Sequence, residues 1–205
     1  DHPVGRLVFF SAAAVYGEDV HNTAITEATP VQPTSYYGAA KFTGECVLRK
    51  AVETPGGLLI VRPPLIYGPG DEGRTYGPSG FVRAALARES ITLWGDGTEL
   101  REFLFVRDAV GLVHRLTFQD TEGVLNLASG RSYTFREAVD AIQRLTGEPL
   151  EIQSRPRTKA MVDNAFSNEA LLQAAPEAQF TLLEDGIRRT LEAEAQRRLA
   201  DAPAR

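Results

Sequence analysis

Short apolar runs alternate with helical patterns along the chain, as in an α/β fold. Residues 6–10 (RLVFF) form a continuous apolar run that predicts a strand buried on both faces of a parallel sheet. Apolar residues recur at helical spacing from Tyr37 to about Glu53, and a second apolar run at Leu58–Val61 predicts another buried strand. We expect a right-handed strand–helix–strand unit, which places the residues after both strands at one edge of the sheet.

Shorter elements follow in the second half of the chain. The pattern predicts a helix at about Phe81–Arg88, strands at Ile91–Trp94, Glu102–Val106 and Val124–Leu127, and helices opened by Asp108 as N-cap and by capping boxes at Thr134–Glu137 and Thr181–Glu184. Polar residues 17–34 and glycine-rich residues 68–80 are expected to form surface loops, and the tail after about Ala195 is expected to fray.

Composition narrows the class of protein. With 43% apolar residues and a net charge of −5 without a basic block, the chain should be globular, with no attraction to nucleic acid or anionic membranes. No apolar run approaches the ~18 residues of a membrane span, and residues 1–10 lack the features of a signal peptide. The single cysteine, Cys46, lies on the apolar side of a predicted helix, so we expect a buried thiol in a cytoplasmic protein. The histidines show no metal-ligand spacing, and no metal is expected.

Tyr37 and Lys41 are the first candidates for chemistry. Residues four apart lie on one face of a helix, so the Tyr37 hydroxyl and the Lys41 ammonium can both point to a ligand at the sheet edge. A nearby cation lowers the pKa of a tyrosine and would let the pair move protons. The alternative is that Tyr37 is a partly buried core aromatic residue and Lys41 a solvated helix residue.

Several ordered motifs surround this pair. They are SAAAVYG at 11–17, a polar loop with PVQP at 30–33, SYYGAAK at 35–41, VRPPLIYGPG at 61–70, WGDG at 94–97, REF at 101–103 and VRD at 106–108. In this order they resemble the extended short-chain dehydrogenase/reductase family, also called the NAD-dependent epimerase/dehydratase family, over nearly the whole chain.

The resemblance implies roles for individual residues. Tyr37 would exchange a proton with a sugar hydroxyl during hydride transfer, and Lys41 would hold the nicotinamide ribose and tune Tyr37. Pro64 would lie beside the nicotinamide, and Arg101 would bind the diphosphate of a nucleotide sugar, with a surface salt bridge as the alternative for Arg101. Tyr76 is a further candidate for substrate contact. The implied cofactor is NAD or NADP, and a homodimer through the helix of Tyr37 is an equal alternative to internal packing of that helix.

The chain also departs from the family pattern. It lacks the glycine-rich turn that receives the cofactor pyrophosphate. Ala12 stands where the family places a serine or threonine that hydrogen-bonds the reacting oxygen, and Ser11 should face the other way. In dehydratases of the family an acidic pair supplies the acid and base that eliminate water, and Ala13 and Ala14 stand in its place. Dehydration is therefore ranked below epimerisation and ketosugar reduction.

The sequence therefore predicts an α/β protein, namely the later part of a Rossmann-like doubly wound parallel sheet with a small C-terminal α/β lobe. Residues 1–68 would belong to the NAD(P)-binding domain and 69–205 mainly to the substrate lobe, with residues of about 100–130 returning to the main domain. The predicted function is that of an NAD(P)-dependent nucleotide-sugar epimerase. The alternatives are an NAD(P)-dependent 4-keto-sugar reductase and a catalytically weakened homologue that binds a dinucleotide or a sugar nucleotide.

Overall fold

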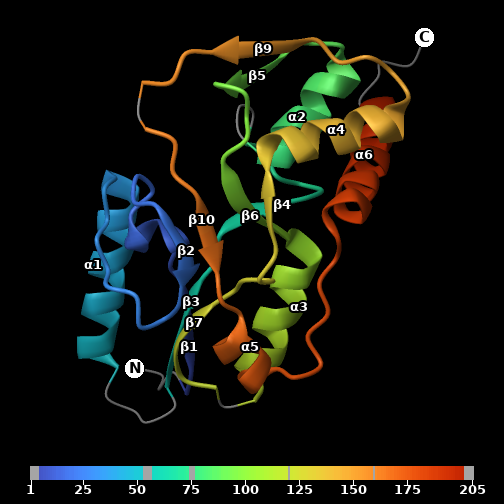
Figure 1. The fold of residues 1–205 in the computed structure, drawn as a ribbon. Helices are drawn as coiled ribbons and strands as arrows, with labels where there is room; N and C mark the ends of the chain where they lie inside the picture. The colour runs from blue at the N-terminus through green and yellow to red at the C-terminus, as the bar shows by residue number, and fades with distance from the viewer. Residues whose placement is uncertain (1–4, 53–56, 74–76, 120, 159, 201–205) are drawn as a thin grey trace.

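The computed structural model describes residues 5–52, 57–73, 77–119, 121–158 and 160–200, and it is a mixed α/β structure (Figure 1). Its first half holds β1 (Leu7–Phe10), the 3-10 helix η1 (Ala13–Tyr16), β2 (Asn22–Ile25), α1 (Tyr36–Ala51), β3 (Leu58–Arg62), β4 (Leu65–Tyr67), α2 (Gly77–Ala87) and β5 (Ile91–Trp94). The second half holds β6 (Leu100–Phe105), α3 (Val106–Thr117), β7 (Gly123–Asn126), β8 (Ser132–Thr134), α4 (Phe135–Thr146), β9 (Ile152–Arg155), β10 (Asn164–Phe166), α5 (Glu169–Ala174) and α6 (Leu183–Ala200).

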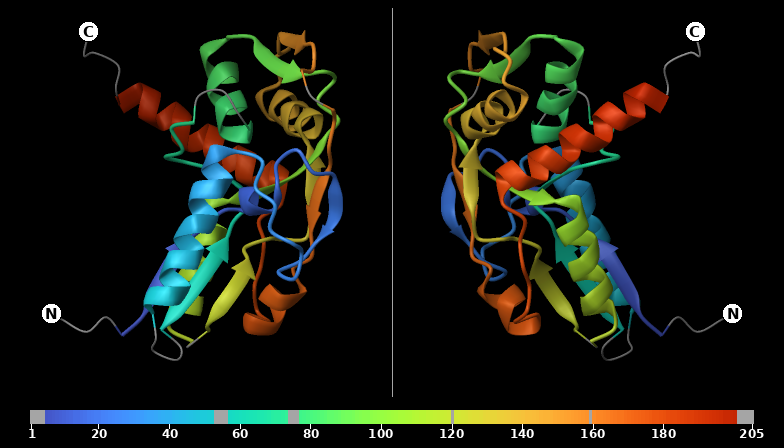
Figure 2. Two further views of the ribbon diagram at one scale, coloured as in Figure 1. Left: turned by 90° about the vertical axis from the view of Figure 1, so that its left-hand side faces the viewer. Right: turned by 90° about the vertical axis from the view of Figure 1, so that its right-hand side faces the viewer.

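The main sheet is parallel and has the order β1-β3-β7. Leu59 and Val61 of β3 pack with Leu125 of β7 and with the apolar face of α3. Helices α1 and α3 flank this sheet on opposite sides, and the views of Figure 2 agree on this arrangement. The three carboxyl ends therefore meet at one edge, as the strand–helix–strand pattern predicts.

The first strand differs from its prediction. Residues 7–10 do form a strand, but it pairs only with β3 among the described residues and stands at the edge of the sheet. Its residues are partly exposed, and Phe10 is open to solvent. The expectation of a strand buried on both faces is wrong, because a continuous apolar run does not reveal whether other elements cover both faces of the strand.

A second layer of structure forms the other half of the molecule. Strands β4, β6 and β8 form one sheet, β5 and β9 form a parallel pair, and α2, α4 and α6 pack around them (Figure 1). Phe81, Phe103 and Phe135 meet edge to face in this core, with ring centroids 5.4 and 6.1 Å apart. The predicted capping box of α4 is confirmed, because Thr134 and Glu137 exchange both hydrogen bonds.

Two predicted helix starts are wrong. Helix α3 begins at Val106, so Asp108 lies in its first turn and is not its N-cap. The Asp108 carboxylate instead accepts hydrogen bonds from the backbone N–H and the hydroxyl of Thr181, at 2.7 and 2.9 Å. That hydroxyl therefore serves a contact between α3 and the chain before α6, and α6 begins at Leu183, two residues after the predicted N-cap Thr181.

Four further expectations from the sequence differ from the structure. The polar stretch 17–34 contains β2, which pairs in parallel with β10 far along the chain. Helix α2 begins at Gly77, before the predicted Phe81, and α6 continues to Ala200 without fraying at Ala195. The Cys46 thiol is exposed, because it lies on the side of α1 that faces away from the sheet.

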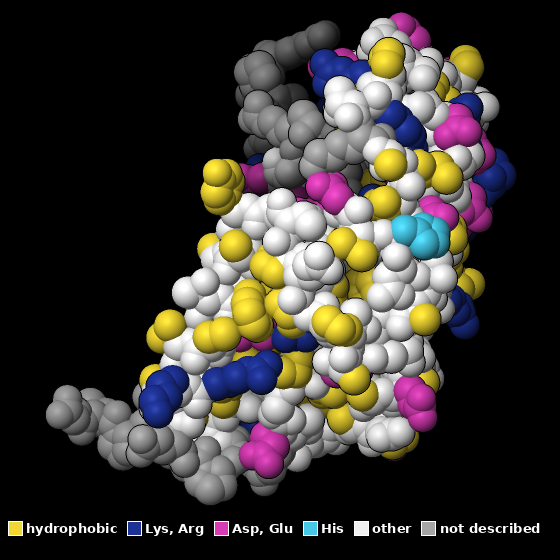
Figure 3. All heavy atoms as spheres, turned by 60° about the vertical axis from the view of Figure 1, so that its left-hand side comes forward, with side chains coloured by type: hydrophobic (Ala, Val, Ile, Leu, Met, Phe, Trp, Pro, Cys, Tyr) yellow, Lys and Arg dark blue, Asp and Glu magenta, His cyan; other side chains and the backbone are white. Residues whose placement is uncertain are grey.

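The exposed side of α1 carries Tyr36, Tyr37 and Val47, and Figure 3 shows this face of the molecule with apolar side chains along it. A homodimer through this helix stays a prediction. Among the described residues, none of the helices is long and apolar enough to cross a membrane.

Candidate active site

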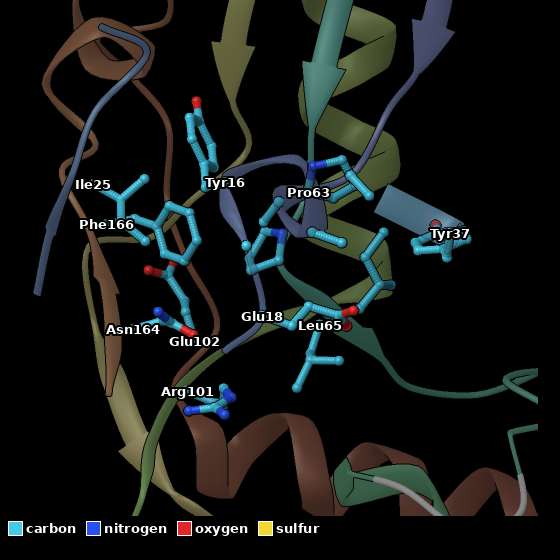
Figure 4. Close-up of a pocket in the computed structure, with 16 residues that line it drawn as sticks. Tyr16, Glu18, Ile25, Tyr37, Pro63, Leu65, Arg101, Glu102, Asn164 and Phe166 are labelled. Carbon is cyan, nitrogen blue, oxygen red and sulfur yellow. The ribbon is translucent and has the colours of Figure 1, made fainter. Parts of the chain in front are cut away.

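A cavity of about 360 Å³ lies where the carboxyl end of β3 meets η1, β6 and β10 (Figure 4). Its walls combine a largely apolar surface with a few polar side chains. They are formed by Ala12, Ala13, Ala14, Tyr16, Gly17, Glu18, Ile25, Tyr37, Pro63, Pro64, Leu65, Ile66, Arg101, Glu102, Asn164 and Phe166. The cavity therefore lies at the sheet edge where α/β proteins bind ligands.

Tyr37 reaches this cavity from the first turn of α1. The Ser35 hydroxyl accepts a hydrogen bond from the Gly38 N–H at 3.1 Å and fixes the start of the helix. Gly38 has no side chain, so the helix can approach the Ala14 carbonyl of η1 closely. The Tyr37 side chain is 56% exposed and lies at the rim of the cavity.

Lys41 lies one turn further along α1, but its ammonium does not act on Tyr37 as expected. Nζ donates a hydrogen bond to the Phe10 carbonyl at 2.8 Å and lies 5.6 Å from the centre of the Tyr37 ring. Burial and the negative charge of Glu18 raise the pKa of Tyr37. The predicted lowering of this pKa is therefore wrong for the structure, in which the phenol keeps its proton at neutral pH.

Ala12 and Ser11 point to opposite sides, as the sequence predicts. Ala12 lies on the cavity floor. Ser11 is buried, and its hydroxyl donates a hydrogen bond of 2.5 Å to Oε1 of Glu45. Ser11 therefore does not replace the hydroxyl that Ala12 lacks.

Glu45 belongs to a buried polar network beneath the site. Arg62 donates to both carboxylate oxygens of Glu45, at 2.8 and 2.6 Å, and also to the Tyr16 hydroxyl at 2.8 Å. Tyr16 in turn donates to Oδ1 of Asn126 at 2.8 Å. Burial alone would raise the pKa of Glu45, but the hydrogen bonds from Arg62 and Ser11 outweigh it and lower that pKa. The network joins α1, η1, β3 and β7.

Sequence reasoning missed this network, although two signals were present. Glu45 is a charged residue on the side of the predicted helix that faces the sheet, and Arg62 ends an apolar strand. Charged residues are rarely buried unless they are paired. Two such residues in neighbouring elements therefore indicate a buried ion pair.

The other predicted site residues come to the same cavity from separate elements. Pro64 follows β3, and the Pro63 carbonyl accepts a hydrogen bond from the Ala13 N–H at 2.8 Å, which holds the floor together. Arg101 comes from β6, where one of its guanidinium nitrogens donates to the Leu100 and Val162 carbonyls, at 2.8 and 2.7 Å. It forms no ion pair with any of the described residues. Tyr76 lies outside the described residues.

Glu102 is a lining residue that sequence reasoning did not select. It is 1% exposed, and one carboxylate oxygen accepts hydrogen bonds from the backbone N–H groups of Ser129 and Gly130. Its other oxygen, Oε2, has no hydrogen-bond partner among the described residues. Burial raises the pKa of Glu102 to about 7, against the effect of these hydrogen bonds. Glu102 follows Arg101 directly in the sequence, but only the fold shows that it is buried beside the cavity.

The order of these residues in the chain and their meeting at one sheet edge agree with a family comparison. A sequence model of the NAD dependent epimerase/dehydratase family matches residues 1–128. The chain belongs to this family. The match covers α1, the strands of the main sheet and the site residues Tyr37, Pro64 and Arg101.

Similar proteins of this family act on nucleotide sugars, according to their names. The chain is 31% identical to a UDP-glucose 4-epimerase of Corynebacterium glutamicum, over 76% of this chain and 52% of that protein. It is 30% identical to a dTDP-4-dehydro-6-deoxy-D-allose reductase of a Streptomyces species, over 76% of this chain and 50% of that protein.

A solved structure shares the fold. The chain superposes with a TM-score of 0.84 on a UDP-N-acetylglucosamine 4-epimerase of Methanobrevibacter ruminantium in complex with UDP-N-acetylmuramic acid, at 23% identity. This likeness covers 94% of this chain and 64% of that one. The chain spans about half the length of the curated relatives it matches.

The residues present fit one end of the family's cofactor. Ala12, Pro63 and Pro64 line the cavity with apolar surface of the kind that a nicotinamide ring needs, and Tyr37 lines it as well, while the Lys41 ammonium is held at the Phe10 carbonyl. The sequence contains no glycine-rich turn for the pyrophosphate. The fit is therefore limited to the nicotinamide and its ribose.

Proposed function

We propose that this chain forms the substrate side of an NAD(P)-dependent nucleotide-sugar epimerase. One observation carries the proposal, namely that Tyr37 and Arg101, which come from α1 and β6, line the same cavity together with Pro64. A nucleotide sugar has a reacting sugar at one end and a diphosphate further along. The sugar needs a group that can transfer a proton, and the diphosphate needs a permanent positive charge. NAD or NADP, when bound, would accept a hydride from the sugar carbon and return it.

Tyr37 is the proposed acid and base. Its raised pKa keeps the phenol protonated, so that in the resting site it can donate a hydrogen bond or a proton to a sugar oxygen. Tyr37 lines a largely apolar cavity, and a bound sugar would cover part of its side chain, which is 56% exposed in the free protein, and so reduce competition by water for that hydrogen bond. The reverse step, in which Tyr37 removes a proton, would need a positive charge near the phenol.

Lys41 is the proposed source of part of this charge and a ligand of the nicotinamide ribose. An ammonium has three donors, and the Phe10 carbonyl occupies one of them. This hydrogen bond holds the side chain beside the carboxyl end of β1 while leaving two donors for a bound cofactor.

Arg101 is the proposed ligand of the diphosphate. The carbonyls of Leu100 and Val162 hold one end of its guanidinium, which orients the remaining N–H groups. A fixed, planar cation binds phosphate oxygens in pairs. Arg101 also borders a second cleft with Trp94 and Arg157, which gives the nucleotide part of the ligand a place to extend.

The test is Tyr37→Phe in the complete protein that contains this chain. With the UDP-, dTDP- or GDP-hexose that the wild type epimerises, kcat should fall by about 10²–10⁴-fold, because the phenylalanine cannot transfer a proton. The control is Tyr36→Phe, whose side chain is 98% exposed and should leave kcat unchanged. Equal turnover by Tyr37→Phe and the wild type would refute the proposed mechanism.

Two other functions have an observation in their favour. A 4-keto-sugar reductase is favoured by the reductase among the relatives, and it would oxidise one NAD(P)H for each sugar, whereas an epimerase consumes none overall. A binding homologue without turnover is favoured by Ala12, and it would hold nucleotide and cofactor stoichiometrically while converting no sugar. Absorbance of NAD(P)H separates the reductase from the other two functions, and chromatographic detection of a converted sugar separates the epimerase from the binding homologue.

A further inference from the structure

Glu102 is a carboxylic acid at the inner end of the cavity that the proposed mechanism does not use. It comes from β6, directly after Arg101, and it lines the cavity although its side chain is buried. In Figure 4 it lies with Asn164 and Phe166 on one side of the cavity, and Tyr37 lies on the other. A sugar whose reacting carbon faces Tyr37 would therefore turn its far side towards Glu102.

The two oxygens of the Glu102 carboxyl group have different surroundings. Oε1 accepts hydrogen bonds from the backbone N–H groups of Ser129 and Gly130, in the loop after β7. Oε2 is buried and has no hydrogen-bond partner among the described residues. Buried oxygens are rarely left without a partner, because they have lost their hydrogen bonds to water. The backbone therefore holds the first oxygen in place, and the second stays open to a further partner.

Two other polar side chains that line the cavity are committed elsewhere. Nδ2 of Asn164 donates to the Val20 carbonyl at 2.8 Å, and the Tyr16 hydroxyl donates to Oδ1 of Asn126, also at 2.8 Å. Neither group pairs with Glu102. Among the described residues, the partner that Oε2 lacks is therefore not supplied by these side chains, and a bound ligand can supply it.

A hydroxyl group suits Oε2 in both of its protonation states. Burial raises the pKa of Glu102 to about 7, against the hydrogen bonds to Oε1 that lower it, so ionised and neutral forms are both present at neutral pH. An ionised carboxylate only accepts hydrogen bonds, whereas a neutral carboxyl group can also donate one. A hydroxyl group donates to the first form and accepts from the second, whereas a methyl group does neither.

We propose that Glu102 is a specificity-determining residue that binds a hydroxyl group on the far side of the sugar through Oε2. This inference rests on the proposed function and adds a third contact to it. Tyr37 and Arg101 are the proposed contacts of the reacting oxygen and of the diphosphate. A contact at Glu102 fixes how the sugar is turned between them, and this orientation is what hydride transfer requires.

A purely structural role for Glu102 makes a different prediction. Its hydrogen bonds to Ser129 and Gly130 hold the loop after β7, and a displaced loop would weaken the binding of every ligand to the same extent. A hydrogen bond between Oε2 and one hydroxyl group affects only the ligands that carry that hydroxyl. The ratio of the Kd values for ligands without and with the hydroxyl therefore separates the two roles.

The direct test removes one sugar hydroxyl at a time. Calorimetry on the complete protein would measure Kd for UDP-glucose and dTDP-glucose, and for the 2-deoxy, 3-deoxy and 6-deoxy analogues of the one that binds more tightly. One analogue should bind about 10–10²-fold more weakly than its parent, which corresponds to one hydrogen bond to a charged group. Equal binding of the parent and all three analogues would overturn this inference and leave the proposed function standing. Failure of both parent sugars to bind would contradict the proposed function as well.

Variants of Glu102 show whether this penalty comes from Oε2. Glu102→Leu removes both oxygens and should abolish the penalty. Glu102→Gln keeps one oxygen for the backbone N–H groups and places an amide nitrogen at the other position. The penalty should then fall by about threefold or more, because a neutral hydrogen bond is roughly half as strong as a charge-assisted one. Glu102→Gln decides the question if Glu102→Leu does not fold.

The matched control is Asn168→Leu, which disturbs the same loop from outside the cavity. Nδ2 of Asn168 donates to the Ser129 carbonyl at 2.7 Å, and Asn168 does not line the cavity. This variant should keep the wild-type penalty even if it weakens binding of all the ligands. A penalty that Glu102→Gln leaves unchanged, or that Asn168→Leu reduces equally, would refute the role of Oε2.

Discussion

At the scale of single residues, Ala12 limits the hydrogen bonds that the cavity can offer to a reacting oxygen. It lies on the floor near Tyr37 and offers no hydrogen bond to a reacting oxygen, while the neighbouring Ser11 is turned to Glu45. A hydroxyl that binds charge developing on oxygen contributes about 10²–10³-fold to the rate in comparable sites. The proposed enzyme therefore works without one of the groups that its family ordinarily uses.

We predict that Ala12→Ser increases kcat of the complete protein by up to about 10²-fold with the nucleotide sugar that it turns over, because the new hydroxyl lies on the same floor as Tyr37. Steady-state kinetics would measure the change. Ala14→Ser adds the same hydroxyl elsewhere on the floor and serves as the control. A decrease with Ala12→Ser, or an equal increase with both variants, would show that the position does not act on the reacting oxygen.

Sequence motifs predicted which residues reach the cavity better than they predicted the environment of those residues. Tyr37, Pro64 and Arg101 follow from short patterns in the sequence, and the fold brings all three to one cavity. Asn164 and Phe166 have no such pattern, and Glu102 lies in the motif REF without being selected, because their place at the cavity depends on how β6 and β10 are arranged. The same limit applies to the pKa of Tyr37, where burial and Glu18 outweigh the spacing to Lys41.

At the scale of elements, α1 is held in place by the buried pair of Glu45 and Arg62. Glu45 is on the helix that carries Tyr37, and Arg62 ends β3 beside the floor of the cavity. Both side chains are buried, so removing one partner leaves an uncompensated charge in the interior. The pair therefore fixes the register of α1 against the sheet.

We predict that Glu45→Gln lowers the free energy of unfolding by about 3–5 kcal/mol at pH 7. Because folding lowers the pKa of Glu45, its contribution is present above the ordinary pKa of 4.5 and is lost as the pH falls below that value. The difference between wild type and variant in urea unfolding should therefore shrink below pH 4.5. Glu177 forms an ion pair with Arg115 and its side chain is 85% exposed, so Glu177→Gln should cost less than about 1 kcal/mol at either pH. A difference that stays constant with pH would contradict the role of the charge.

Elements with strong local signals were predicted closely, and those that depend on distant partners were not. Helix α1 was expected at Tyr37–Glu53 and is found at Tyr36–Ala51, because Ser35 caps its start. Strand β2 was missed, since its four residues form a strand only through pairing with β10. The edge position of β1 likewise depends on its neighbours and leaves no mark on its own apolar run.

At the scale of the whole molecule, the last helix closes the second core against elements from both halves of the chain. Helix α6 packs on α2 and α4, and its Leu183 and Ile187 belong to the same buried cluster as Tyr67. The Tyr67 hydroxyl donates to the Leu183 carbonyl at 3.3 Å. Gly186 makes this approach possible, because a Cβ atom there would overlap the Tyr67 hydroxyl and crowd the Phe105 ring.

We predict that Gly186→Ala lowers the free energy of unfolding by about 1–3 kcal/mol, which is the usual cost of overpacking a filled core. Gly111→Ala is the matched control, because Gly111 is also helical but has nothing within 4 Å of an added Cβ. That substitution should stabilise the protein by about 0.5–1 kcal/mol, since alanine loses less backbone entropy than glycine in a helix. Urea unfolding of the three proteins would measure both effects. If Gly186→Ala were as stable as Gly111→Ala, the approach of α6 to Tyr67 would not limit packing, and α6 would be free to shift away from β4 without loss.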